Sequence, residues 1–195
     1  MQADYFRYCA LLASGGIYSD VDYRCTGSLR RWIEDEESDA FLLRREARNT
    51  AGEVSMMPVL NSFMIFKQAG HPLLELALSM ATSGVEQTLG EEGSGKLAAV
   101  FVTGPFIFTG LRLALELGSL EAFSDRLAGT GLAPLGERIC ETIGEYERVV
   151  RAFDRVRLLT LEEAGVLDGP GFKLPYKATK DHWANFGSDI YRSAG

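Results

Sequence analysis

Two carboxylates separated by one residue, Asp20 and Asp22, are the residues of this 195-residue chain best suited to chemistry. The preceding residues, Ile17 to Ser19, suit a short strand. Side chains two positions apart in an extended segment point to the same side, so both carboxylates can converge on one cation or its water shell. Hard divalent cations prefer such oxygen ligands. The pattern therefore predicts a divalent-metal clamp at the end of a strand.

A helix is expected to lead into this strand and to carry further polar groups. Gly15 and Gly16 are expected to end it. Asp4 and Arg7 lie one turn apart on it, where they can pair with each other or point together at a polar ligand. The helix is expected from Gln2 to Ser14, because Tyr5, Tyr8, Cys9 and Leu12 recur at three- and four-residue spacing.

The rest of the chain alternates between expected strands and helices, which predicts an α/β layered domain. Residues 83–96, rich in Gly, Ser and Glu, are expected to form a mobile surface loop, and the acidic run 34–39 a solvated one. Thr103 is a candidate helix cap, with Pro105 tolerated in the first turn. The other expected elements are strands at 41–43, 61–66 and 156–159, and helices at 72–82, after 105 through 117, at 119–128 and at 161–164.

Composition narrows the class of protein. With 46% hydrophobic residues, the chain suffices for one domain with a sizeable core. The formal charge is -7 and no basic run stands out, so nucleic acid is a poor candidate partner. No apolar run of about 18 residues and no signal peptide are visible, which predicts a soluble chain. The compartment is not encoded in these residues.

Single residues of reactive type have plain structural interpretations. Cys9, Cys25 and Cys140 form no CxxC pair, so they are expected to be buried free thiols. His71, just before a helix-starting proline, is expected to be structural. Trp32, beside an isoleucine, is expected in the core.

The N-terminal motifs together are more specific than their parts. Ala3-Asp4-x-x-Arg7-Tyr8, Leu11 and Gly15-Gly16-Ile17-Tyr18-x-Asp20-x-Asp22 resemble the sugar-binding signature of glycosyltransferase family 32. That family includes fungal α-mannosyltransferases and is distantly related to glucosylating bacterial toxins. Downstream, the resemblance extends to Asn61-Ser62-Phe63-Met64, Gly70-His71-Pro72-Leu73 and Thr103-Gly104-Pro105.

The resemblance implies an α/β fold of the GT-A type and sugar transfer with retention of anomeric configuration. Asp20 would contact the donor ribose and the water shell of the metal, and Asp22 would ligate Mn²⁺ or Mg²⁺ directly. Asp4 and Arg7 would hold hydroxyls of the donor sugar. The same pocket would be lined by Tyr18 and Asn61.

The C-terminal segment resembles the part of the family that closes the site. His182 resembles the late histidine of the family and would touch the metal or the diphosphate. Asn185 or Ser188 would complete that shell, and Trp183 would stack on a sugar or a nucleobase. The family commonly ends this segment with Ser-Trp, whereas Asp189 follows Ser188 here.

The implied partners are a UDP- or GDP-hexose donor and a glycan, lipid or protein acceptor, with membrane association through a segment outside this chain. The expected location is the Golgi lumen or a membrane in a eukaryote, and the cytoplasm in a bacterium. Residues 1–195 are expected to form one catalytic domain within a longer protein, because the N-terminal nucleotide-binding portion of the family is not in view.

Three other interpretations compete. A haloacid dehalogenase-type phosphotransferase also uses Asp-x-Asp after a strand, but it expects a stronger apolar run before the acids. An EF-hand loop fails because Arg24 takes the fifth position, where an oxygen ligand belongs. A non-catalytic, truncated glycosyltransferase-like domain that binds sugar or a protein partner would keep every matched residue.

Overall fold

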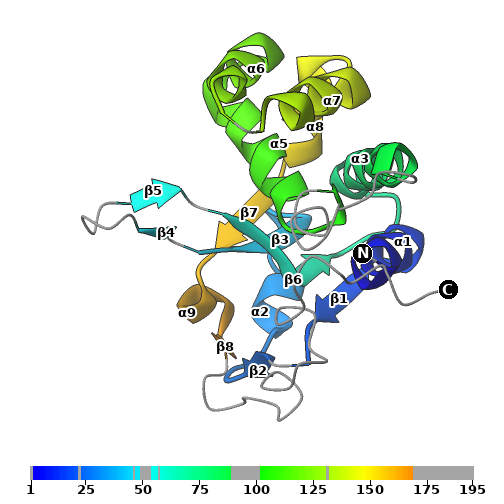
Figure 1. Ribbon diagram of the computed structural model, residues 1–195. Helices are drawn as coiled ribbons and strands as arrows, with labels where there is room; N and C mark the ends of the chain where they lie inside the picture. The colour runs from blue at the N-terminus through cyan, green and yellow to red at the C-terminus, as the bar shows by residue number, and fades with distance from the viewer. Residues whose placement is uncertain are drawn as a thin grey trace, which may run out of the picture.

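A mixed sheet organises the described part of the chain, and the expected α/β class is confirmed (Figure 1). The structure is a computed structural model that describes residues 2–21, 23–45, 47–48, 54–56, 58–88, 102–130 and 132–168. Among these residues, four strands form the main sheet. In spatial order they are β1 (Gly16–Ser19), β6 (Val59–Phe66), β3 (Ala40–Arg44) and β7 (Val156–Leu159). Only the β3–β7 pair is parallel, and the other two pairs are antiparallel.

Alternating side chains of the central strands supply two separate cores. In β3, Leu42 packs into the larger core, while Phe41 and Leu43 pack into the smaller one. In β6, Met64 packs into the larger core and Ile65 into the smaller one. Because adjacent side chains of a strand point to opposite faces, these near-continuous apolar runs require cover on both faces of the sheet.

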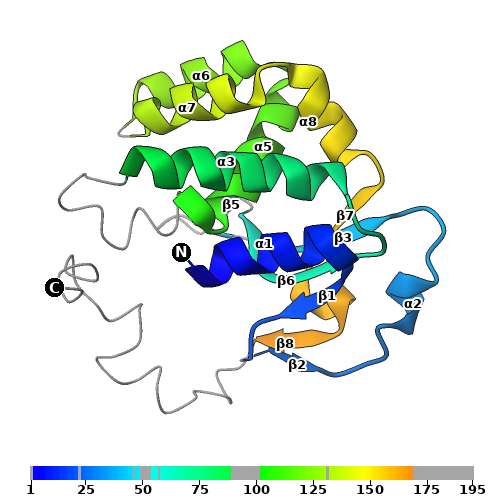
Figure 2. The same ribbon diagram turned by 90° about the vertical axis from the view of Figure 1, so that its right-hand side faces the viewer.

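The larger core lies under a layer of helices. Helices α1 (Gln2–Ser14), α3 (Pro72–Thr88) and α5 (Phe106–Leu117) lie over this face of the sheet (Figures 1 and 2). Two further helices, α6 (Leu120–Ala128) and α7 (Ala133–Ile143), lie farther from the sheet (Figure 1). The layer is completed by α8 (Tyr146–Phe153).

The opposite face carries the smaller core, which includes Trp32, as expected. Two short helices cover it, α2 (Arg30–Ile33) and α9 (Leu161–Ala164). Two small antiparallel pairs flank the sheet: β2 (Tyr23–Cys25) with β8 (Val166–Asp168), and β4 (Ala47–Arg48) with β5 (Val54–Met56). None of the described helices is long and apolar enough to span a bilayer.

The expected elements are largely confirmed, with several corrections. The loop predicted at 83–96 is wrong over its first six residues, because α3 runs on to Thr88; residues 89–96 lie outside the described part. Gly84 has a packing role, since a Cβ there would meet the Val102 side chain at 2.7 Å. Three helices, α2, α7 and α8, and two strand pairs, β2–β8 and β4–β5, were not expected.

The other corrections concern single side chains. Thr103 does not cap α5: the N-cap position is Pro105, which makes no side-chain cap bond. The cysteines are free, but none is buried, since Cys25 is exposed and Cys9 and Cys140 are half-buried. In the acidic 34–39 segment, the three glutamates are exposed, the two aspartates are half-buried and Ser38 is buried.

The return from α1 into β1 depends on Gly15. Its φ of +64° is a left-handed conformation, and its N–H donates to the Leu11 carbonyl at 2.7 Å. A Cβ at this position would lie 2.9 Å from the Phe66 carbonyl oxygen and from the Gln68 carbonyl carbon. The chain therefore requires glycine here for both its backbone conformation and the close approach of β6.

Replacing Gly15 by alanine should destabilise the protein by about 3 kcal/mol, since left-handed strain and a backbone clash add together. Gly118→Ala is the matched control. Gly118 also has a positive φ, +77°, but a Cβ there would meet nothing within 4 Å. It should cost only about 1 kcal/mol. Urea unfolding measures both values, and equal losses would contradict the role of the close approach.

His71 is structural, as expected. Its Nδ1 accepts the Leu73 N–H at 3.2 Å, which satisfies one of the free donors at the start of α3. Its ring packs edge-on against Phe66, with centroids 5.0 Å apart. Burial lowers the pKa of His71 below its usual value, while the charge of Asp39 opposes this shift.

The folded protein should therefore lose stability as the pH falls below about 6.5, because unfolded His71 takes up a proton that the folded form resists. His71→Asn keeps an acceptor for the Leu73 N–H but cannot titrate. The two proteins are compared by urea unfolding between pH 7 and pH 5. The free energy of unfolding of the unaltered protein should fall further than that of the variant, and parallel curves would rule out this role.

Candidate functional site

The guanidinium of Arg7 lies at the centre of the polar side chains between α1 and the sheet. The residue is only 6% exposed. Its Nη1 donates to the Asn61 backbone carbonyl at 2.7 Å, and its Nε donates to the Ala3 carbonyl at 3.3 Å. These bonds tie the first turns of α1 to the first half of β6.

Two carboxylates share this guanidinium. Arg7 Nη2 lies 3.3 Å from Asp4 Oδ1, and Nη1 lies 3.4 Å from Asp20 Oδ1. The Arg7 Cζ also lies 4.4 Å from the centre of the Tyr18 ring, a cation–π contact. Asp4 and Arg7 are therefore part of a largely buried cluster and not a surface ion pair, with side chains 18% and 8% exposed.

Asp20 is held at several points. Its backbone N–H donates to the Ser62 carbonyl at 2.7 Å, and its own carbonyl accepts the Tyr23 N–H at 3.1 Å. The Tyr18 hydroxyl donates to Asp20 Oδ1 at 2.8 Å. Burial, followed by this bond to Asp20, raises the pKa of Tyr18 to about 12, so Tyr18 stays a donor at neutral pH. The Asp20 side chain is still 34% exposed, more open than that of Asp4.

Asn61 connects this cluster to the segment before α5. Its Nδ2 donates to Asp4 Oδ1 at 3.0 Å and to the Tyr8 hydroxyl at 2.9 Å. The Tyr8 hydroxyl in turn donates to the Thr103 carbonyl at 2.7 Å. The Thr103 hydroxyl donates to Asp4 Oδ2 at 3.3 Å. The cluster thus unites α1, the end of β1, β6 and a segment almost a hundred residues after Asp4.

The structure brings five of the expected site residues into one network: Asp4, Arg7, Tyr18, Asp20 and Asn61. Sequence reasoning missed the site roles of Tyr8 and Thr103. Both residues lie in motifs that resemble the family, but Tyr8 was otherwise assigned to an apolar helix face and Thr103 to a helix cap, and neither was given a role in the site. The other expected site residues lie outside the described part of the chain: Asp22, His182, Trp183, Asn185 and Ser188.

Within the described ranges, no three His, Cys, Asp or Glu side chains gather to hold a metal ion. Asp20 nevertheless fits the donor set of a hard cation. It offers a carboxylate at the end of a strand, partly open to solvent and held through its backbone and Oδ1. The described residues thus supply one suitable ligand.

Residues 1–39 match the family described as "Glycosyltransferase sugar-binding region containing DXD motif". The match covers α1, β1, β2 and α2. Asp20-Val21-Asp22 is the only Asp-x-Asp within these residues. The beginning of the chain is therefore similar to a glycosyltransferase sugar-binding region. Of the clustered polar residues, those on α1 and around β1 fall inside the match, whereas Asn61 and Thr103 lie outside it.

One similar solved structure is "PaToxG Glycosyltransferase", with 18% sequence identity and a TM-score of 0.40. The similarity covers 78% of this chain and 51% of that one, so the chain spans about half the length of that protein. The comparison with curated proteins found no match.

Removing the Arg7 cation should destabilise the protein strongly, because it leaves two partly buried carboxylates facing each other. Arg7→Met should cost about 3 kcal/mol. The control is Arg112→Met, which removes an arginine whose Nε pairs with Glu116 at 2.8 Å on the surface of α5. It should cost about 0.5 kcal/mol or less. Denaturant unfolding compares the variants, and equal costs would show that the Arg7 cluster is not structural.

Proposed function

We propose that the chain carries the donor site of a metal-dependent, retaining glycosyltransferase. Its donor would be a UDP- or GDP-hexose and its acceptor a glycan, a lipid or a protein, on a GT-A-like fold. The observation that supports this most directly is Asp20. This partly exposed carboxylate lies at the end of β1, inside the segment similar to the DXD family, and it is fixed by Arg7, Tyr18 and the Ser62 carbonyl.

A fixed carboxylate suits this chemistry better than a mobile one. Sugar transfer from a nucleotide develops negative charge on the diphosphate leaving group, and groups already in position stabilise that charge without reorganising. Arg7 holds Asp20 from the side of α1, and the β6 backbone holds it from the sheet. The network therefore serves to pre-organise the acid before a donor arrives.

In this proposal Asp20 and Asp22 would hold Mn²⁺ or Mg²⁺, which would supply positive charge to neutralise the diphosphate. Asp4 and Asn61 hold hydroxyls of the sugar, beside Tyr18. Arg7 mainly keeps Asp4 and Asp20 in place, because its donors already contact protein groups. The resemblance gives four more residues a part in metal or diphosphate binding and site closure: His182, Trp183, Asn185 and Ser188.

The reaction needs no covalent nucleophile on the protein. In the mechanism implied by the resemblance, the acceptor hydroxyl attacks the sugar from the face of the departing phosphate, which takes up the proton. The side chains of this chain would orient the sugar and hold the acids. Fixed hydrogen bonds and charge would supply most of the stabilisation.

A second candidate is a non-catalytic domain that binds sugar or a protein partner. The specific observation in its favour is that Arg7 and Asn61 are buried and bonded to protein groups. These residues would stabilise the fold even if the protein catalysed no sugar transfer. Donor chemistry distinguishes the two candidates.

The test is release of sugar from UDP-glucose, UDP-galactose and GDP-mannose by the full-length protein in Mn²⁺. The unaltered protein should hydrolyse or transfer one of these donors. Asp22→Ala and Asp20→Asn should each lower kcat by about 100-fold or more, as loss of one fixed charge-stabilising group does.

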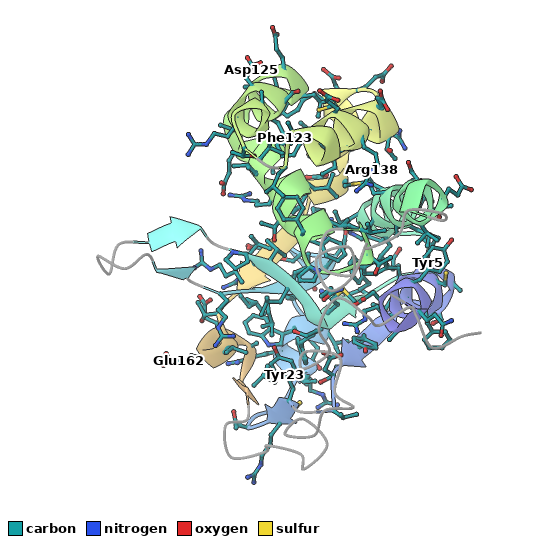
Figure 3. All side chains as sticks on the ribbon, in the orientation of Figure 1. Tyr5, Tyr23, Phe123, Asp125, Arg138 and Glu162 are labelled. Atoms are coloured by element: carbon teal, nitrogen blue, oxygen red, sulfur yellow. The ribbon has the colours of Figure 1, made fainter. Side chains whose placement is uncertain are left out.

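The control variant is Asp125→Ala. Asp125 is an exposed acid on α6, at the end of the helical layer remote from Tyr23 and the β2–β8 pair (Figure 3). It should retain full activity. If the Mn²⁺-loaded protein neither binds nor turns over any donor, the transferase proposal fails and the binding-domain alternative stands.

A further inference from the structure

The Tyr8 hydroxyl faces two groups that restrict what it can do. Tyr8 is completely buried on α1. Its oxygen lies 2.7 Å from the Thr103 carbonyl and 3.4 Å from the Gly104 carbonyl. Carbonyl oxygens only accept hydrogen bonds, so the single phenol hydrogen must point toward this segment.

This direction fixes the amide of Asn61. With its hydrogen committed, the Tyr8 oxygen can only accept from Asn61, so the NH₂ group and not the oxygen of that amide must face it. The distance is 2.9 Å. The second amide hydrogen is used by Asp4 Oδ1 at 3.0 Å. Both donors of the Asn61 side chain are thus consumed inside the protein.

What remains of the Asn61 amide is its carbonyl oxygen. This oxygen accepts no hydrogen bond from any described residue. Over the same part of the chain, no side-chain nitrogen or oxygen is both fully buried and without a partner, so the Asn61 oxygen keeps access to solvent. Asn61 therefore presents only an acceptor, as do the neighbouring carboxylates of Asp4 and Asp20.

We propose that Tyr8 is a positioning residue that, together with the Asp4 carboxylate, sets the hydrogen-bond polarity of Asn61, so that this part of the site accepts only a sugar hydroxyl that donates. This inference rests on the proposed donor site and narrows its substrate class. A donor with a free hydroxyl at this position fits. A deoxy sugar, or one that places an acyl oxygen there, leaves the Asn61 oxygen without a hydrogen.

Two observations separate this role from packing alone. Burial, together with the negative charge of Asp4, keeps the pKa of Tyr8 well above its usual value against the opposing bond from Asn61, so the phenol keeps its hydrogen. The ring itself packs edge-on against Phe108, with centroids 5.4 Å apart. A phenylalanine at position 8 would keep that packing and lose only the hydroxyl.

The experiment compares Tyr8→Phe with Tyr5→Phe. Tyr5 lies on the same helix, but its hydroxyl pairs with Thr82 of α3 at 2.8 Å (Figure 3). The first readout is hydrogen exchange of the Asn61 side-chain amide by NMR, assigned through its loss in Asn61→Asp. In the unaltered protein and in Tyr5→Phe, both amide hydrogens should exchange at least about tenfold more slowly than in a free asparagine peptide, and in Tyr8→Phe one should lose this protection.

The second readout is KM and kcat for UDP-glucose and GDP-mannose and for their monodeoxy derivatives, with Mn²⁺. In the unaltered protein and in Tyr5→Phe, loss of one particular hydroxyl should raise KM about tenfold. In Tyr8→Phe this penalty should shrink to about twofold, because an amide held by Asp4 Oδ1 alone no longer keeps its oxygen firmly directed at that hydroxyl. The kcat for the parent donor should change less than its KM.

The outcomes distinguish the two proposals. If the unaltered protein turns over a donor but Tyr8→Phe keeps the same deoxy penalties as Tyr5→Phe, the role of Tyr8 is refuted and the transferase function stands. Unprotected Asn61 amide hydrogens in the unaltered protein also refute it, without requiring any variant to fold. If no donor is bound, both the proposed function and the proposed sugar preference are refuted. The NMR measurement still tests the orientation of the Asn61 amide.

Discussion

Burial of one guanidinium is the constraint around which this end of the molecule is arranged. A buried charge is costly unless charges and hydrogen-bond acceptors surround it. Arg7 obtains these partners from three elements: Asp4 lies one turn away on its own helix, Asp20 follows β1, and the Asn61 carbonyl belongs to β6. The position of α1 relative to the sheet and the position of the site acids are therefore set by the same contacts.

The pairing of β1 with β6 also fixes the position of Asp20, the more exposed of the two acids. The register of β1 against β6 pairs Ser19 with Phe63, and the ladder ends with the Asp20 N–H on the Ser62 carbonyl. The glycine return before β1 fixes where that strand starts, so few free torsions remain between α1 and Asp20. Asp20 is thus placed by backbone geometry as much as by its side-chain partners. Such rigidity is what the proposed donor site would require.

The spacing of apolar residues predicted those helices and strands that depend mainly on neighbouring residues in the sequence. The three- and four-residue spacing in residues 2–14 and the apolar runs of β3 and β6 gave α1 and the central strands. Glycine misled the prediction at 83–96, because Gly84 lies inside α3, where it admits Val102. Gly136 similarly lies within α7 against Leu127. The Tyr8 and Thr103 contacts span about a hundred residues, and no spacing in the sequence reports them.

The Arg7 network both stabilises the fold and holds the acids of the proposed site, and this affects how related sequences should be interpreted. Since Arg7 and Asn61 hold α1 to β6, selection for stability alone would preserve them in a related protein that lacked the proposed transferase activity. Retention of these residues is therefore weak evidence of activity. Asp20, which is the more exposed of the two acids that Arg7 holds, can change at a smaller structural cost. Loss of that acid while Arg7 and Asn61 remain would be the expected mark of an inactive lineage.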